Sequence, residues 1–115
     1  MWNSELMSDI EILTSEIVSF IQERDWDQFH TPKDTALALS IEASELNEVF
    51  LWKKDSDADI DKIKEELADV FIYALDLARQ YNLDVAEIIR AKVKRNGEKY
   101  PVSKCMGTIK KYTEL

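Results

Sequence analysis

Two acidic pairs are the residues of this sequence whose types and spacing best support chemistry. Glu42 and Glu45 stand three positions apart, and so do Glu66 and Asp69. Residues three apart share a face of an α-helix, so each pair would present its two carboxylates together. Mg²⁺ prefers oxygen ligands and usually shares its shell with waters and substrate phosphates. Two helices that bring both pairs to one face would therefore form a Mg²⁺ site for a triphosphate.

The acidic pairs are interleaved with apolar rows. Glu42 falls in line with the expected buried row Leu39, Leu46 and Val49, and Glu66 lies on the edge of a second seam. That seam runs at steps of three and four through Ile60, Ile63, Leu67, Val70, Ala74, Leu77 and Tyr81. A carboxylate beside a core is costly unless something pairs with it. A solvated acidic face remains the alternative for either pair taken alone.

The same carboxylates could take part in a hydrolytic reaction. Bound cations would neutralise a triphosphate, and a carboxylate could orient or deprotonate an attacking water. Glu42 or Glu45 is the favoured base because both interrupt apolar rows, and the sequence does not choose between them. A di-iron bundle is the competing metal site, but it requires Glu-x-x-His on its helices. The single His30 precedes the second expected helix, which disfavours that alternative.

Aromatic side chains could complete a nucleotide pocket. Trp26, Trp52 and Tyr73 come from three different segments, and a nucleobase could stack on such rings. His30 stands close to Trp26 in sequence and could line the same pocket. The competing explanation is that these residues belong to the core or to an interface.

Helical periodicity and capping signals predict four helices, at residues 4–24, 32–53, 57–81 and 85–97. Thr31 with Pro32, then Ser56, then Asp84 provide the expected starts. Tyr100-Pro101 is expected to end the regular structure. Four helices joined by short turns indicate an all-α, four-helix bundle.

Apolar residues exceed what one such bundle can bury. Phe50 and Leu51 follow one another, and Phe71 and Ile72 point away from the seam of the third helix. We therefore expect the chain to form a homo-dimer or tetramer, which would bury these side chains between subunits.

Composition narrows the classes of partner. The 115 residues carry a net charge of −8, which argues against a nucleic-acid polymer, and residues 90–115 hold eight basic and two acidic residues. An acidic body with a basic end could bind a metal and a polyanion together. The alternative, equally expected from charge alone, is that the lysines only keep the last helix solvated. Cys105 stands alone, so no disulfide framework is expected. The apolar runs are too short for a membrane span, which favours a cytoplasmic protein.

Four stretches together resemble the MazG-like, all-α nucleotide pyrophosphohydrolases, and most of all their dCTP pyrophosphatase branch. The stretches are ERDWDQFHTP (23–32), EASELNEVFLWK (42–53), EELADVFIYALDLA (65–78) and AKVKRNGEKYP (91–101). The resemblance implies a MazG-like domain over residues 1–102, followed by a basic tail over 103–115. It also implies dimers or tetramers with sites at subunit interfaces.

The resemblance implies roles for individual positions. Glu42, Glu45, Glu66 and Asp69 match the family's metal ligands. The expected substrate-binding residues are Trp26, Asp27, Gln28, Phe29, His30, Trp52, Tyr73, Lys92 and Asn96. The chain departs from the family pattern at Ile17, where animal relatives carry a base-contacting His, and at Gly97, where many relatives have Arg.

The activity implied is Mg²⁺-dependent hydrolysis of a dNTP to dNMP and pyrophosphate, with dCTP or a related or modified pyrimidine nucleotide as the expected substrate. A non-catalytic helical regulator that binds nucleotide or metal, and a structural oligomerisation domain, are the alternatives. Mg²⁺-dependent nucleotide binding would exclude the oligomerisation domain, and release of pyrophosphate would exclude the regulator.

Overall fold

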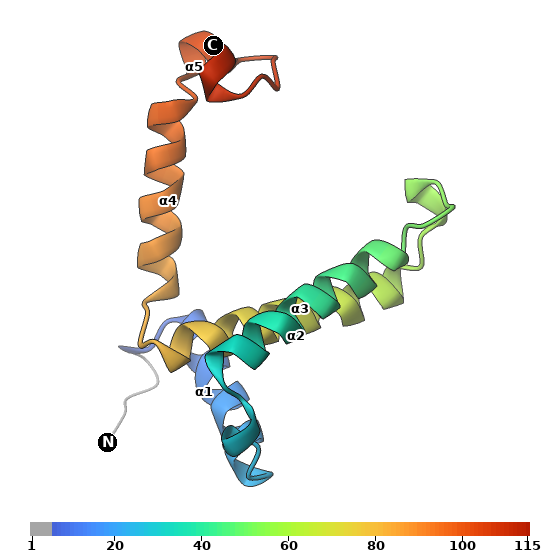
Figure 1. Cartoon of the computed structure of the whole chain (residues 1–115), viewed down its shortest axis with the longest axis vertical. Helices are drawn as coiled ribbons and strands as arrows, with labels where there is room; N and C mark the ends of the chain where they lie inside the picture. The colour runs from blue at the N-terminus through green and yellow to red at the C-terminus, as the bar shows by residue number, and fades with distance from the viewer. Residues whose placement is uncertain (1–5) are drawn as a thin grey trace. The chain divides into compact units, whose positions relative to one another are not determined.

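The computed structural model describes residues 6–115, and over that range every regular element is a helix and none is a strand (Figure 1). The all-α class is therefore confirmed. Five α-helices are present there: α1 (Asp9–Glu23), α2 (Pro32–Glu48), α3 (Ile60–Gln80), α4 (Val85–Lys99) and α5 (Val102–Cys105). Three short 3₁₀ segments accompany them: η2 (Asp27–Phe29), η3 (Asp55–Asp57) and η4 (Tyr112–Glu114). None of the described helices is long and apolar enough to cross a membrane.

The chain divides into two compact units at the junction of Leu83 and Asp84. In the first unit, α2 and α3 lie side by side as an antiparallel hairpin, and α1 packs against α3 (Figure 1). Its most deeply buried apolar residues are Ile21, Val49 and Ala78. The second unit contains α4, α5 and η4.

Helix α1 begins at Asp9, later than expected. The expected start at Ser4 lies outside the described residues. Ser8 caps the helix by accepting a hydrogen bond from the Glu11 backbone N–H at 3.2 Å. Because a serine side chain satisfies one of the free N–H groups of the first turn there, the helix begins at this point.

Helix α2 begins as predicted but ends early. The Thr31 hydroxyl accepts from the Asp34 N–H at 3.2 Å, and Pro32 occupies the first turn. The predicted end at Lys53 is wrong, because the last α-helical residue is Glu48 and a turn follows. Trp52 takes a positive φ of 63° in this turn. A left-handed residue cannot continue a right-handed helix, so the chain reverses there towards α3.

Helix α3 is capped by Asp59, so the prediction of Ser56 as its cap is wrong. The Asp59 carboxylate accepts from the Asp61 N–H at 2.9 Å, while Ser56 lies within η3. Two capping residues one turn apart compete here, and the carboxylate has the added attraction of the positive helix end.

Helix α4 begins at its predicted cap, since the Asp84 carboxylate accepts from the Glu87 N–H at 3.1 Å. The predicted end near Asn96-Gly97 is wrong. Gly97 does not adopt the left-handed conformation of a helix-ending glycine, and the helix continues to Lys99. It stops before Tyr100, the residue that precedes Pro101 and is thereby disfavoured in helix.

Short helical segments α5 and η4 follow, so the expectation of no regular structure after Pro101 is also wrong.

The predicted seam of α3 is buried only in part, since Ile60 and Tyr81 at its two ends are about 60% exposed. The four residues predicted to exceed the capacity of the fold are indeed open to solvent: Phe50 37%, Leu51 47%, Phe71 60% and Ile72 39%. This exposed apolar surface is available for contact with a partner.

Candidate metal centre and nucleotide pocket

The α2–α3 hairpin brings three of the four predicted metal ligands together. Glu42 and Glu45 project from α2 and Glu66 from α3, and each offers a carboxylate oxygen within 4.8 Å of the other two. Asp69 lies outside this 4.8 Å group, but its negative charge contributes to the raised pKa of both Glu42 and Glu66. The antiparallel register of the hairpin thus places the two acidic pairs opposite each other.

Burial and mutual repulsion make these carboxylates hard to ionise together. Burial is the largest cause that raises the pKa of Glu42 to about 7, followed by a hydrogen bond to Glu45 and by the negative charges of Glu45, Asp69 and Glu66. The pKa of Glu66 is raised for the same kinds of reason, with burial first. Such a cluster favours a proton or a cation.

Two oxygens in the cluster are buried without a hydrogen-bond partner among residues 6–115. They are Oε2 of Glu42 and Oε2 of Glu66. A buried carboxylate oxygen without a partner is costly. A hard divalent cation prefers oxygen ligands of this type, so the donor set and the two unpaired oxygens fit Mg²⁺. The three-carboxylate group contains no histidine, unlike the Glu-x-x-His sites of di-iron bundles.

Tyr73 lies one turn beyond Asp69 on α3 and is half-buried. Its pKa is raised mainly by burial and then by the negative charges of Glu42 and Asp69. Tyr73 therefore lies within electrostatic reach of the acidic cluster.

Trp26 is supported by the end of α1. Its ring meets Phe20 edge to face, with centroids 5.8 Å apart, and the Arg24 guanidinium lies 3.8 Å from the centroid of the Phe20 ring. Trp26 nevertheless remains 43% exposed. A fixed but accessible ring of this kind can stack on a base.

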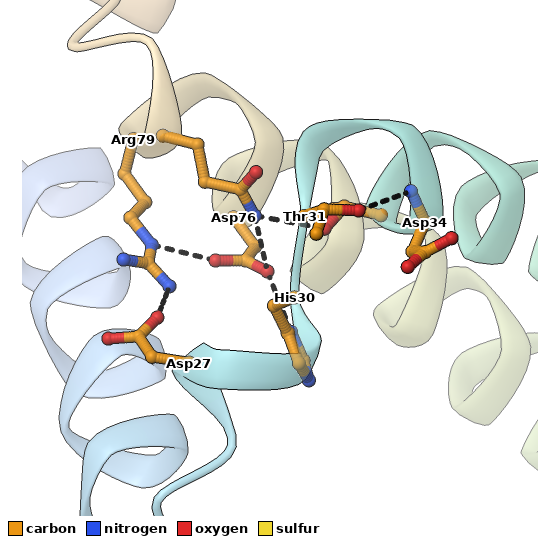
Figure 2. A network of polar contacts seen from close by, with 8 residues as sticks. Asp27, His30, Thr31, Asp34, Asp76 and Arg79 are labelled. Carbon is orange, nitrogen blue, oxygen red and sulfur yellow. Dashed lines mark hydrogen bonds and ion pairs between the residues drawn. The ribbon is translucent and has the colours of Figure 1, made fainter.

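An ion pair links Asp27, in the predicted pocket segment after Trp26, to Arg79 of α3. Arg79 Nη2 donates to the Asp27 carboxylate at 2.6 Å, and its Nε donates to Asp76 Oδ1 at 2.7 Å (Figure 2). The hydrogen bond from Arg79 is the largest cause that lowers the pKa of Asp27. Gln28 donates to the backbone oxygen of Asp25, and Phe29 is 66% exposed. Asp27 and Gln28 therefore engage the protein itself in this structure.

His30 contacts a residue that sequence reasoning missed. Its Nδ1 lies 3.1 Å from Oδ2 of Asp76, and Asp76 is almost fully buried. Gln80 joins the same cluster by donating to Asp76 Oδ2 at 3.3 Å, and it also donates to Thr35 at 2.9 Å. One signal in the sequence could have indicated Asp76, because an acid follows Tyr73 three positions later on the face that carries Asp69.

Trp52 does not share a pocket with Trp26 within one chain. The two residues lie beyond opposite ends of α2, whose 17 residues span about 25 Å. Trp52 is also fully exposed. The prediction that Trp26, Trp52 and Tyr73 line one pocket is therefore not met inside a single copy of this chain.

Lys92 and Asn96 lie on α4, in the second unit. Both are exposed and stand one helical turn apart. They present a basic and an amide group to solvent from one face of that helix.

Comparison with known proteins agrees with these features. The MazG-like family model matches residues 37–115. The chain is 38% identical to dCTP pyrophosphatase 1 of Mus musculus over 117 residues, which covers 95% of this chain and 67% of the relative; the protein of the same name from Homo sapiens gives the same figures. A crystal structure of a pyrophosphatase from Archaeoglobus fulgidus is similar with a TM-score of 0.74 and 34% identity, covering 83% of this chain and 94% of that one.

The acidic cluster lies within the matched region, and the family match extends through α5 and η4 to the last residue. From the extent of the family match and the identity to its relatives, this chain belongs to the MazG-like family.

Proposed function

We propose that this protein is a Mg²⁺-dependent nucleoside triphosphate pyrophosphohydrolase that converts a dNTP to dNMP and pyrophosphate. The observation that most strongly supports this proposal is the three-carboxylate cluster of the α2–α3 hairpin, with its two buried and unpaired oxygens. The relatives named dCTP pyrophosphatase 1 support the reaction class and favour dCTP as substrate. The proposal also includes related or modified pyrimidine nucleotides.

Glu42, Glu45, Glu66 and Asp69 would hold the metal. When bound there, Mg²⁺ supplies positive charge that neutralises the triphosphate and relieves the repulsion among the carboxylates.

The chain's own groups perform the remaining tasks. Glu42 or Glu45 takes a proton from the water that attacks the α-phosphate, and pyrophosphate leaves from the opposite side. Trp26 and Tyr73 hold the base and sugar, together with the segment Asp27–His30. Lys92 and Asn96, which stand one turn apart on α4, would donate hydrogen bonds to phosphate oxygens.

The working enzyme is a homo-oligomer, a dimer or a tetramer. Exposed Phe50, Leu51, Phe71 and Ile72 support this assembly. Trp52 reaches the base pocket from a second copy, because it is too far along α2 to meet Trp26 of its own chain.

A panel of natural and 5-substituted nucleoside triphosphates, incubated with Mg²⁺, tests this function. The products are separated as NMP with pyrophosphate or as NDP with phosphate. Release of NMP and pyrophosphate from a pyrimidine dNTP is expected. Binding without turnover would instead assign the chain to the non-catalytic regulators.

A further inference from the structure

Asp76 is a buried acid that the metal cluster does not use. It lies on α3 with about 1% of its surface exposed, and both of its oxygens are engaged. Oδ1 accepts from Arg79 Nε at 2.7 Å. Oδ2 lies 3.1 Å from His30 Nδ1 and accepts from Gln80 Nε2 at 3.3 Å. A buried carboxylate with this many partners is held in one orientation.

The partners of Asp76 determine which nitrogen of His30 carries the proton. The guanidinium of Arg79 is always charged and pairs with the ionised form of the acid, which can only accept hydrogen bonds. The hydrogen between His30 and Asp76 therefore belongs to Nδ1. In the neutral imidazole, Nε2 is then left with a free lone pair.

His30 also belongs to the segment that the proposed function assigns to the base and sugar. It directly precedes the Thr31 cap of α2 and follows η2, and Arg79 ties Asp27 of η2 to the same Asp76. Figure 2 shows the second ring nitrogen of His30 turned away from Asp76. The side chain of His30 keeps 21% of its surface exposed. The protein thus holds the imidazole through Nδ1, while part of the His30 side chain stays exposed.

We propose that Asp76 is a positioning residue that fixes His30 in its Nδ1–H form, so that Nε2 accepts a hydrogen bond from a donor group of the nucleotide. The role in substrate binding rests on the proposed function, whereas the tautomer does not. The donor is either an exocyclic amine of the base or the 3′-hydroxyl of the sugar. Carboxylates that orient a histidine through its other nitrogen commonly tune that residue in this way.

Asp76→Asn provides a sharp test because it should reverse the tautomer. The side-chain oxygen of the new amide would still accept from Arg79, which turns its NH₂ group towards His30 Nδ1. Nδ1 must then accept, and the proton moves to Nε2. Thr35→Val is the matched control, since Thr35 is equally buried in the same cluster but bonds Gln80 and not His30.

Nitrogen chemical shifts of His30 report the tautomer directly, and the assignment is unambiguous because the chain has one histidine. Long-range ¹H–¹⁵N correlation at a pH where the imidazole is neutral should show Nδ1–H in the wild type and in Thr35→Val, and Nε2–H in Asp76→Asn. An Nε2–H form in the wild type would overturn the proposal, even if the Asp76 variant failed to fold.

Kinetics separate positioning from general support of the fold. Asp76→Asn should raise KM by roughly three- to tenfold, the value of one hydrogen bond, with kcat within about twofold. In a His30→Ala background, the same change should alter KM by less than about twofold, because nothing is left to position. An equal effect of Asp76→Asn in both backgrounds would reject the coupling through His30.

Substrate analogues identify the donor. The preference for dCTP over dUTP tests the exocyclic amine, and the preference for dCTP over its 2′,3′-dideoxy form tests the 3′-hydroxyl. One of these preferences should disappear in His30→Ala. If both preferences persist unchanged, Nε2 does not contact the nucleotide. If the wild type hydrolyses no nucleotide, the proposed function fails, while the chemical shifts still decide what Asp76 does to His30.

Discussion

Glu42 on α2 and Glu66 on α3 each bury one carboxylate oxygen that has no hydrogen-bond partner within the described chain, and both belong to a group whose oxygens lie within 4.8 Å of one another. Two acids so placed repel each other in a setting that disfavours charge. The acidic cluster of the hairpin is therefore unfavourable when no cation offsets its charge, and it could hold a divalent cation. Binding and stability should be linked at this site, which leads to measurable predictions.

The first prediction concerns pH in the metal-free protein. Glutamate titrates near 4.5 in an unfolded chain, whereas the pKa of Glu42 in the folded protein is raised to about 7. Between these values the folded state binds more protons than the unfolded state, so the free energy of unfolding falls as pH rises through this window. The melting temperature in the presence of a chelator should drop from about pH 5 to about pH 7.5.

Glu42→Gln is the matched variant for this measurement because it keeps the shape and removes the ionisation. The decline in melting temperature should be shallower in Glu42→Gln than in the wild type. Equal slopes in the two proteins would show that Glu42 titrates as an ordinary exposed acid.

Local signals explain which parts of the fold could be predicted. The all-α class follows from helical periodicity, and the caps at Thr31 and Asp84 were found because each depends on a residue three positions away. The end of α2 was missed because residues 49–52 retain a helical apolar pattern. The positive φ of Trp52 could not be predicted either, because the residue type does not indicate it. The cap of α3 was misplaced because Ser56 and Asp59 both fit the signal.

The same distinction between local and long-range signals applies to the candidate site. The i, i+3 pairs are local, so the sequence could propose these acids as ligands from their spacing, and three of the four do come together. His30 and Asp76 are 46 residues apart, and their contact depends on the register of the hairpin, which the sequence does not specify. The same limit applies to Trp26 and Trp52, which their aromatic side chains and the family resemblance suggested for one pocket although α2 separates them.

The second prediction concerns Trp52. Its side chain is fully exposed, so Trp52→Ala should leave the melting temperature of the first unit nearly unchanged. If the ring stacks on the base of a nucleotide bound to another copy, its loss removes roughly 1–3 kcal/mol of binding, and KM should rise by about tenfold or more. Steady-state kinetics with circular dichroism as the folding control measure both effects. Unchanged kinetics in a folded variant would remove Trp52 from the pocket.

The third prediction concerns assembly. The exposed apolar side chains of Phe50, Leu51, Phe71 and Ile72 should be covered by a second copy, because water contact with this surface is unfavourable. Light scattering at micromolar concentration should give a mass that is a multiple of the 13.4 kDa chain. Phe71→Glu should shift the protein towards the monomer and lower activity together with mass. A wild-type mass near that of one chain would reject the assembly.

The last prediction concerns the acids themselves. Glu45→Gln and Asp69→Asn each remove one negative charge from the cluster, so the metal-free variants should be as stable as the wild type or more stable. Both changes also remove a proposed ligand, and most turnover should be lost. Mg²⁺ with a non-hydrolysable triphosphate should raise the melting temperature of the wild type, since a ligand stabilises the state that binds it, and should raise that of the variants much less.

Glu48→Gln is the control for this comparison, because Glu48 lies on the same helix and is exposed outside the three-carboxylate group. It should keep both the activity and the stabilisation by Mg²⁺ and nucleotide. Thermal melts of the four proteins, with and without the ligands, distinguish a metal site from a structural acidic face. Variants at Glu45 and Asp69 that lose stability without ligand, yet hydrolyse nucleotide at the wild-type rate, would show that these carboxylates support the fold and hold no catalytic metal.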